Sequence, residues 1–219
     1  MNGFNRHRKI IDIISGVSIL AFPAMLLIGF LLHPDILSFE IVSTPEQLAN
    51  NFRGSAIWHI GHLIVAFAIP FIIFAVIHFM NVLKEKGLWY GIVGGVAGIF
   101  GSVALGLDKG SLCLILSGFD TLPDEQFVGL IPYLQVIIDK AGLLVVNWLF
   151  LLIPIGVIIQ TIGLVKEKYV ARWQGTLIII GLLLLINPDI EIISTVGAFF
   201  MIAGFYPLGV QTIRNAGGR

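Results

Sequence analysis

Six long apolar stretches follow one another along the chain, each bounded by charged residues, prolines or polar turns. They cover residues 10–32, 56–83, 88–107, 141–165, 171–187 and 190–213. A helix of roughly 20 apolar residues crosses a bilayer core about 30 Å thick, and a backbone in lipid satisfies its hydrogen bonds as a helix or a closed barrel. None of the stretches has the alternating pattern of a barrel strand. The pattern therefore predicts an all-α fold, a polytopic membrane protein with a six-transmembrane-helix bundle that forms one integral membrane domain over residues 1–219.

Two of the stretches differ from the rest. The fifth, 171–187, is short, and we expect its helix to stand nearly upright or to be shielded by its neighbours. The third carries six glycines, and two pairs of them, Gly91 with Gly95 and Gly94 with Gly98, are spaced four residues apart. Because small residues at this spacing let helices approach closely, we expect the third helix to be buried at the centre of the bundle.

The distribution of basic residues predicts the orientation. With the N-terminus inside, ten of the 13 Lys and Arg residues fall on the inner side of the membrane. The three on the outer side are Arg53, Lys109 and Lys140. Since inner segments of membrane proteins are enriched in Lys and Arg, we expect a multi-pass protein of the cell membrane whose N- and C-termini are both cytoplasmic.

The composition narrows the class of protein and its partners. Apolar residues make up 57% of the chain and charged residues 12%, and the mean hydropathy is +0.98, so a water-soluble fold would lack polar residues to cover its surface. The formal net charge is zero, which gives no basic field for nucleic acid. The expected partner is the lipid bilayer; the sequence leaves open a homo-oligomer or a membrane partner subunit.

Two outer segments show helical signals of their own. Ser43 and Thr44 precede Pro45 and Glu46, a combination typical of a helix start, so we expect a short surface helix from Pro45 to about Asn51. Residues 126–139 place apolar side chains on one helical face, and Pro132 would bend that helix. Residues 111–119 are apolar but too short to span the membrane.

Three histidines form the first candidate site. His33 ends the first apolar stretch, whereas His59 and His62 lie one helical turn apart at the start of the second. All three are therefore expected near the outer face. Imidazole is a good ligand for a transition metal or a haem iron, so these residues are candidate metal ligands. The competing interpretation is that they bind water, lipid headgroups and loop carbonyls.

A second set of polar residues is expected at the same membrane face. Asp108 and Lys109 lie at the outer end of the third stretch, and such charges usually face the protein interior or a water-filled pocket. Successive helical side chains point about 100° apart, so we expect the two not to pair with each other. One would instead reach the histidines, and the other Asp139 or Asp189. Asn147 and Asn187 also lie on the outer side. The side-chain amide of an Asn at such a position either contacts a ligand or forms hydrogen bonds between helices.

The leading functional hypothesis is a non-enzymatic membrane protein that binds or transports a small solute through an outward-facing polar pocket. Its ligand-binding candidates are His33, His59, His62, Asp108, Asn147 and Asn187. The sequence contains no nucleophile elbow, P-loop or zinc-hydrolase motif that would indicate an enzyme. Two alternatives stay open: a redox protein with haem or a transition metal at the three histidines, and an accessory or structural membrane subunit.

Overall fold

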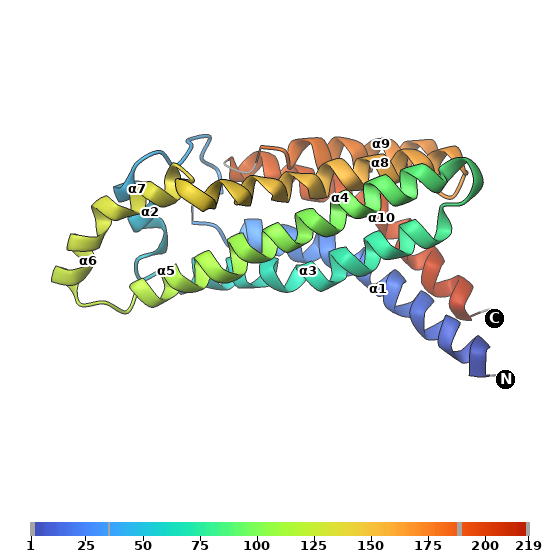
Figure 1. Ribbon diagram of the computed structural model, residues 1–219, viewed down its shortest axis with the longest axis horizontal. Coiled ribbons are helices and arrows are strands. Elements are labelled where there is room, and N and C mark those ends of the chain that lie inside the picture. The colour runs from blue at the N-terminus through green and yellow to red at the C-terminus, as the bar shows by residue number, and fades with distance from the viewer. Residues whose placement is uncertain (1–2, 35, 188–189, 218–219) are drawn as a thin grey trace.

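The computed structural model describes residues 3–34, 36–187 and 190–217, with side chains from residue 7 onward. The described residues form helices and connecting segments and contain no strand, which confirms the all-α fold (Figure 1). The six longest α-helices are α1 (Gly3–Leu31), α3 (Ala56–Val82), α4 (Leu88–Leu105), α8 (Leu152–Lys166), α9 (Arg172–Leu184) and α10 (Glu191–Gly217). Between them lie the shorter elements α2 (Pro45–Phe52), η1 (Glu85–Gly87), η2 (Gly106–Leu112), α5 (Cys113–Phe119), α6 (Asp124–Leu130), η3 (Ile131–Leu134), α7 (Gln135–Ile138) and η4 (Gly142–Leu151).

Five helical segments are long and apolar enough to cross a membrane. They are His7–Leu31, Ala56–Val82, Glu85–Phe119, Gly142–Lys166 and Glu191–Gly217. The expected fifth span differs, because α9 has only 13 residues. At 1.5 Å per residue it is about 20 Å long, which is less than the thickness of a bilayer core. Length and composition therefore indicate a membrane protein with five such helices and one short apolar helix.

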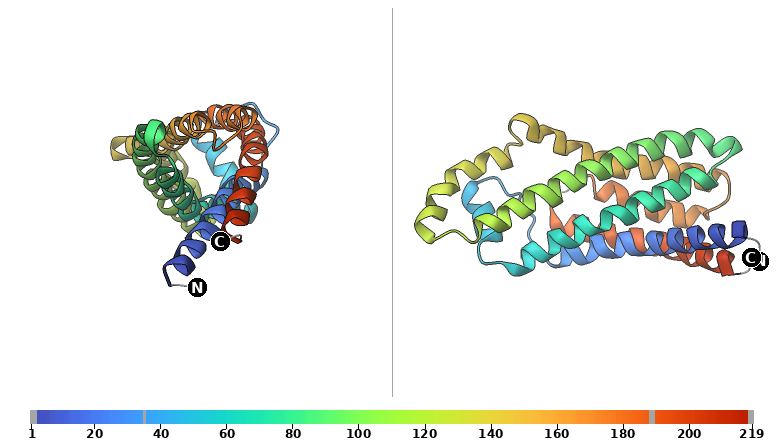
Figure 2. Two further views of the ribbon diagram at one scale, coloured as in Figure 1. Left: turned by 90° about the vertical axis from the view of Figure 1, so that its right-hand side faces the viewer. Right: turned by 60° about the horizontal axis from the view of Figure 1, so that its bottom comes forward.

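The long helices form a ring in which each packs against two neighbours. The order around the ring is α1, α3, α4, α8, α9 and α10, and α10 packs against α1 to close it. Figure 2 shows this arrangement in the view along the bundle. Phe22, Phe79 and Phe205 fill the interior, with ring centroids 5.1 Å apart for Phe22–Phe205 and 6.0 Å apart for Phe79–Phe205. We refer to these three side chains as the aromatic plug.

The expectation that the third helix lies at the centre of the bundle is wrong. Its outward face is exposed, as Val93 (52%) and Phe100 (63%) show. The glycines serve two contacts instead: a Cβ atom at Gly95 would lie 2.3 Å from the side chain of Met80 on α3, and one at Gly94 would lie 2.4 Å from the carbonyl oxygen of Gly156 on α8. Two small-residue faces on one helix therefore admit two close neighbours in a ring.

The third helix also extends beyond the predicted end at residue 107. A π-helical segment, η2, continues α4 without a break into α5, so the apolar run 111–119 lengthens this helix. A π-turn inserts a residue into the helical ladder and often marks a functional position. Here it contains Asp108 and Lys109.

The outer cap, defined as residues 36–55 and 120–141, covers one end of the ring (Figure 1). It contains α2, which begins with the predicted cap: the Thr44 hydroxyl accepts a hydrogen bond from the backbone N–H of Gln47, and the Gln47 side chain accepts one from Thr44. The expected single helix over 126–139 is broken into α6, η3 and α7, and Pro132 lies in the 3₁₀ turn between them. A second apolar core that includes Phe52, Trp58 and Phe127 joins the cap to the bundle.

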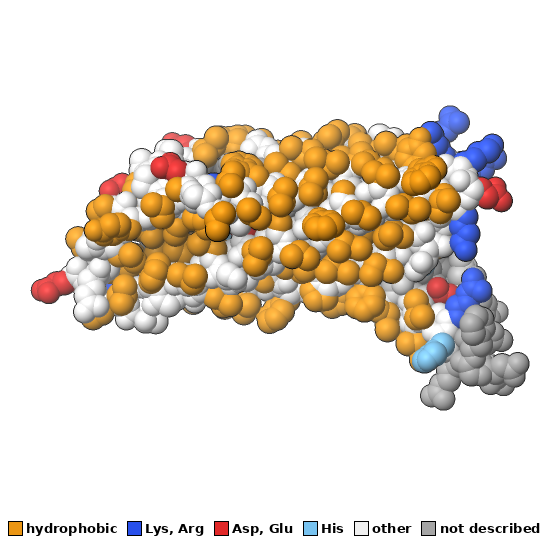
Figure 3. Space-filling model, in the orientation of Figure 1, with side chains coloured by type: hydrophobic (Ala, Val, Ile, Leu, Met, Phe, Trp, Pro, Cys, Tyr) orange, Lys and Arg blue, Asp and Glu red, His pale blue; other side chains and the backbone are white. Residues whose placement is uncertain are grey.

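Charge is distributed unevenly between the two ends of the bundle. Figure 3 shows apolar side chains along the flank, with Lys and Arg side chains gathered at the end opposite the cap. The first turn of α1, the last turn of α10 and the α3–α4 and α8–α9 connections lie at that basic end (Figure 1). Arg6 and Arg219 contribute to the predicted basic side, but their side chains lie outside the described residues.

Candidate functional site

Two cavities lie near the capped end of the ring. The outer chamber, with a volume of about 400 Å³, lies beneath the cap, and its walls include Glu40, Asn51 and Lys140. The axial chamber, about 110 Å³, lies deeper among the long helices. Its lining comes from α1 and His33 after it, α3, α4, η2, η4, the start of α8, α10 and Leu185, the residue that follows α9. The outer volume falls within the range of small-molecule sites.

Five polar residues line both chambers, and we call them the polar collar. They are His33, His62, Asp108, Lys109 and Glu191. From His62 the axial chamber follows α3 as far as Ile72, ten residues further along, which corresponds to about 15 Å of helix. Ile72 lies in the middle part of α3. The collar therefore stands where a wide polar space meets a narrower space inside the bundle.

Asp108 contacts three polar side chains from within the collar. Its side chain is 7% exposed. Asn147 Nδ2 donates a hydrogen bond to Asp108 Oδ1 at 3.0 Å, and Lys109 Nζ and Lys140 Nζ lie 3.3 and 3.7 Å from its carboxylate oxygens. One buried carboxylate thus holds an amide and two ammonium groups that come from three parts of the chain.

The Asp108–Lys109 contact corrects the sequence-based expectation that these neighbours would not pair. That expectation assumed a regular α-helix, in which successive side chains diverge by about 100°. Both residues lie in the π-helical segment, where the wider turn reduces this angle, and the long Lys109 side chain folds back to the carboxylate. The expected alternative contact with Asp139 is replaced by an Asp139–Gln135 hydrogen bond, and Asp189 lies outside the described residues.

His33 connects the end of α1 to the start of α10. Its Nε2 lies 3.5 Å from Glu191 Oε1, and its side chain is 15% exposed. Burial, assisted by the positive charge of Lys109, lowers the pKa of His33 to about 4. The ring is therefore neutral at physiological pH. Its Nδ1 is buried and has no hydrogen-bond partner among the residues that the structure describes.

His62 is held by the residue one turn before it. Its Nδ1 lies 2.9 Å from the backbone carbonyl oxygen of Trp58, and the two rings pack with centroids 3.8 Å apart. A carbonyl oxygen only accepts, so Nδ1 carries the hydrogen, and Nε2 of the neutral ring is an acceptor. The His33 and His62 ring centroids are 5.5 Å apart, so these two predicted residues do meet at the collar.

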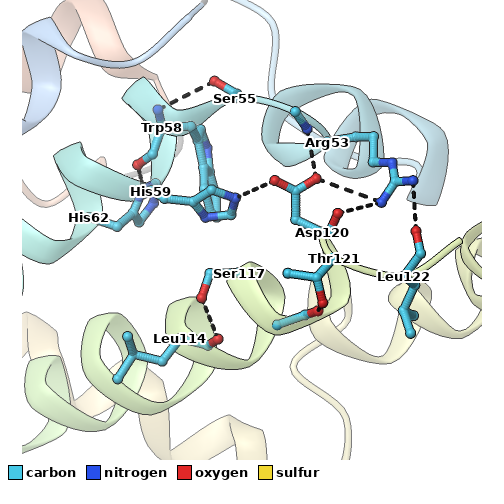
Figure 4. Close-up of polar contacts among 12 residues, drawn as sticks. Arg53, Ser55, Trp58, His59, His62, Leu114, Ser117, Asp120, Thr121 and Leu122 are labelled. Atoms are coloured by element: carbon cyan, nitrogen blue, oxygen red, sulfur yellow. Dashed lines mark hydrogen bonds and ion pairs between the residues drawn. The ribbon is translucent and has the colours of Figure 1, made fainter.

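His59 belongs to a different contact network. Its Nε2 lies 3.1 Å from Asp120 Oδ2, and Figure 4 shows its ring directed toward Asp120 and the Arg53 guanidinium beyond it. Arg53 donates hydrogen bonds to the carbonyl oxygens of Asp120 and Leu122 and forms an ion pair with Asp124. This network fastens the outer cap to the start of α3, and His59 lines neither chamber.

The described residues contain no group of three or more His, Cys, Asp or Glu side chains placed to hold a metal ion. The three histidines predicted as metal ligands are divided, with two at the collar and His59 at Asp120. They therefore do not form a three-ligand metal centre in this arrangement. Asn187 lines neither chamber, and its backbone carbonyl accepts a hydrogen bond from Ser194, which lines the axial chamber.

Sequence reasoning missed Glu191, Lys140 and Trp58 as members of the site. Glu191 had a visible signal, because it is the only charged residue between 190 and 213, and charges in such segments usually face a protein interior. Lys140 and Trp58 had no comparable signal, since their positions depend on how the cap folds over the ring.

Comparison with known proteins adds no assignment to this geometry. The chain matches no protein-family model, and no curated protein or solved structure is significantly similar to it.

Proposed function

We propose that this protein is a six-helix integral protein of the cell membrane, with α9 as a short sixth span and both chain termini in the cytoplasm. The distribution of basic residues supports this orientation, because the inner segments hold ten of the 13 Lys and Arg residues. The gathering of these side chains at the end opposite the cap also supports it (Figure 3). The cap and both chambers then face the outside.

Accessibility of terminal tags tests the orientation. An epitope tag placed on either end should be labelled only after the cells are permeabilised. A tag inserted at Gly54, which is in the cap and has open space around its Cα, serves as the externally accessible control. Labelling of both terminal tags on intact cells would contradict the proposed orientation.

We further propose that the protein binds or transports a small solute through the outward-facing pocket. The observation that carries this proposal is the meeting of two chambers at one buried polar collar. A concave site with a few convergent polar groups is the usual form of a ligand site. Buried charges are costly in a membrane protein unless they are paired or serve a function. The collar residues His33, His62 and Asp108 are the proposed ligand contacts, whereas Asn147 lines neither chamber and acts by holding the Asp108 carboxylate.

Ligand-induced thermal stabilisation tests this function. The purified protein in phosphatidylcholine nanodiscs would be screened against small polar solutes, because a ligand at 100 times its Kd stabilises a fold by about 2.7 kcal/mol. His62→Ala should abolish the response to any hit. His59→Ala is the matched control, since His59 lies outside both chambers. Equal loss of the response in both variants would remove the collar from the proposal.

The other two hypotheses have no specific observation in their favour. The haem or metal alternative stays a prediction, and a visible spectrum together with elemental analysis of the purified protein tests it directly. The accessory-subunit alternative stays a prediction, for which co-purification of a stoichiometric partner is the test.

A further inference from the structure

The two chambers differ in chemical character. The outer chamber has a mixed lining, with polar side chains of the cap, such as Glu40, Gln47 and Asn50, beside apolar ones such as Ile41 and Leu48. Away from the collar, the axial chamber is lined mainly by apolar side chains, among them Leu26 and Ile72. A ligand that fills both would place a polar group above the collar and an apolar group below it. This is the structure of an amphiphile.

The charges of the collar favour an uncharged head group. Asp108 and Glu191 contribute two negative charges, whereas Lys109 and the neighbouring Lys140 contribute two positive charges. These charges already contact one another or His33, and His33 is neutral. The four charges sum to zero, so a charged head group would leave a net charge at this buried site, which is costly. Hydroxyl groups can instead donate to acceptors such as His62 Nε2 and accept from the lysines.

The axial chamber sets the length of the apolar tail. A volume of about 110 Å³ holds roughly four groups of the size of a water molecule at about 30 Å³ each, and a methylene group is of similar size. Further inward the interior is closed by the aromatic plug, whose three side chains are at most 2% exposed. A tail of about four carbons therefore fits, whereas the chains of a membrane phospholipid are too long.

We propose that the two chambers together bind a soluble, uncharged, short-chain amphiphile, with its hydroxylated head in the outer chamber and a tail of about four carbons in the axial chamber. This inference rests on the proposed solute-binding function and specifies its ligand class. The ligand enters from the outer side, where the larger chamber lies beneath the cap.

A homologous series of vicinal alkanediols with tails of one to eight carbons tests the proposal. Binding is measured by calorimetry on the protein in phosphatidylcholine nanodiscs, and empty nanodiscs correct for partition into lipid. Affinity should rise about four-fold with each buried methylene and stop rising at a tail of about four carbons. Alkylamines and alkanoates of the same tail length, which carry charged heads, should bind more weakly.

Leu185 allows the depth of the axial chamber to be changed. It follows α9 and lines that chamber, whereas Leu183, two residues earlier in α9, does not and is 54% exposed. Leu185→Phe should shorten the tail length at which the affinity stops rising. Leu185→Ala should lengthen it by up to about three carbons, the number of carbons that the substitution removes. Leu183→Phe and Leu183→Ala are the matched controls and should leave this tail length unchanged. Two opposite substitutions keep the test informative if one variant does not fold.

Three results would overturn the amphiphile assignment. The first is an affinity that is independent of tail length. If the diols still bind and His62→Ala abolishes that binding, the proposed polar-solute function stays intact and only the amphiphile assignment fails. The second is a rise through eight carbons that none of the Leu185 variants alters, which indicates partition into lipid. The third is a stoichiometric phospholipid in the native mass spectrum. If no diol binds while another polar solute stabilises the wild type but not His62→Ala, only this assignment fails; if nothing binds, both proposals fail.

Discussion

Replacing Asp108 by Asn tests whether one buried carboxylate neutralises the lysines at the collar. The substitution keeps the size of the side chain and an oxygen that can accept from Asn147 Nδ2. It removes only the negative charge that faces Lys109 and Lys140 at 3.3 and 3.7 Å. The two ammonium groups would then lie close together without a carboxylate between them.

The expected loss of stability follows from how deeply the group is buried. Removing one partner of a fully buried ion pair costs about 3–5 kcal/mol, whereas an exposed pair contributes at most about 1 kcal/mol. The Asp108 side chain is 7% exposed, but the Lys109 and Lys140 side chains are 30% and 24% exposed because they face the outer chamber. We therefore expect a loss of about 2–3 kcal/mol for Asp108→Asn.

Thermal unfolding of the protein in nanodiscs, followed by tryptophan fluorescence, measures this loss. For a chain of 219 residues, 1 kcal/mol corresponds to about 2–4 °C in Tm, so Asp108→Asn should lower Tm by about 4–12 °C. The double variant Asp108→Asn with Lys109→Met should recover part of the loss, because it removes an unpaired charge. Asp124→Asn is the control, since that carboxylate is 96% exposed in its pair with Arg53. An Asp108→Asn protein as stable as the wild type would refute the reasoning. So would a double variant whose loss of stability equals the sum of the losses in Asp108→Asn and Lys109→Met alone.

The remaining predictions concern the α1–α10 contact, the α4–α8 crossing and the cap. The pKa of His33 is about 4 in the folded protein and 6.5 in the unfolded chain, so the unfolded state binds more protons between these values and stability falls as pH is lowered from 6.5 to about 4. His33→Gln should lose this pH-dependent part of the stability, which amounts to at most about 3 kcal/mol. Measuring Tm as a function of pH tests this. Gly94→Ala should destabilise the protein by about 1–3 kcal/mol, because its Cβ would lie 2.4 Å from a carbonyl oxygen of α8. Arg53→Ala should speed amide hydrogen exchange over residues 120–125, because its guanidinium holds two carbonyl oxygens there, while exchange in the long helices stays unchanged.

Each of these three predictions has a control or a contradicting outcome. A pH dependence of Tm that is identical in His33→Gln and the wild type would show that His33 does not couple stability to pH. Gly118→Ala is the control for Gly94→Ala, since nothing lies within 4 Å of a Cβ at Gly118. Exchange over residues 120–125 that is unaffected by Arg53→Ala would mean that the apolar core at Phe52 and Phe127 holds the cap without the guanidinium.

The elements that depend on local sequence could be predicted. Long runs of apolar residues specify helices whatever their neighbours are, and the helices over 56–82 and 191–217 follow the predicted stretches closely. The start of α2 was likewise readable, because the Thr44 cap and Gln47 lie within one turn of each other. Both signals act over a few residues, so no knowledge of the rest of the fold is needed.

The candidate site was only partly predictable, because its geometry depends on small rotations. His59 and His62 lie one turn apart at the start of the same helix, but the ring of helices turns His62 toward the interior and His59 toward Asp120. A residue spacing restricts two side chains to one face of a helix and does not determine what that face contacts. Asp108 and Lys109 pair because both lie within a π-helical segment, and no feature of the local sequence predicts that segment.

By itself, the sequence determined the helical class, the long apolar stretches and the asymmetry of charge, because hydropathy and charge are properties of the residues. The tertiary structure decided that the helices form a ring, that Glu191 meets His33 across the α1–α10 contact, and that a cap encloses a chamber above them. These features bring together residues more than a hundred positions apart. Such contacts depend on the packing of whole helices, and many arrangements of six apolar helices satisfy the same hydrophobic pattern.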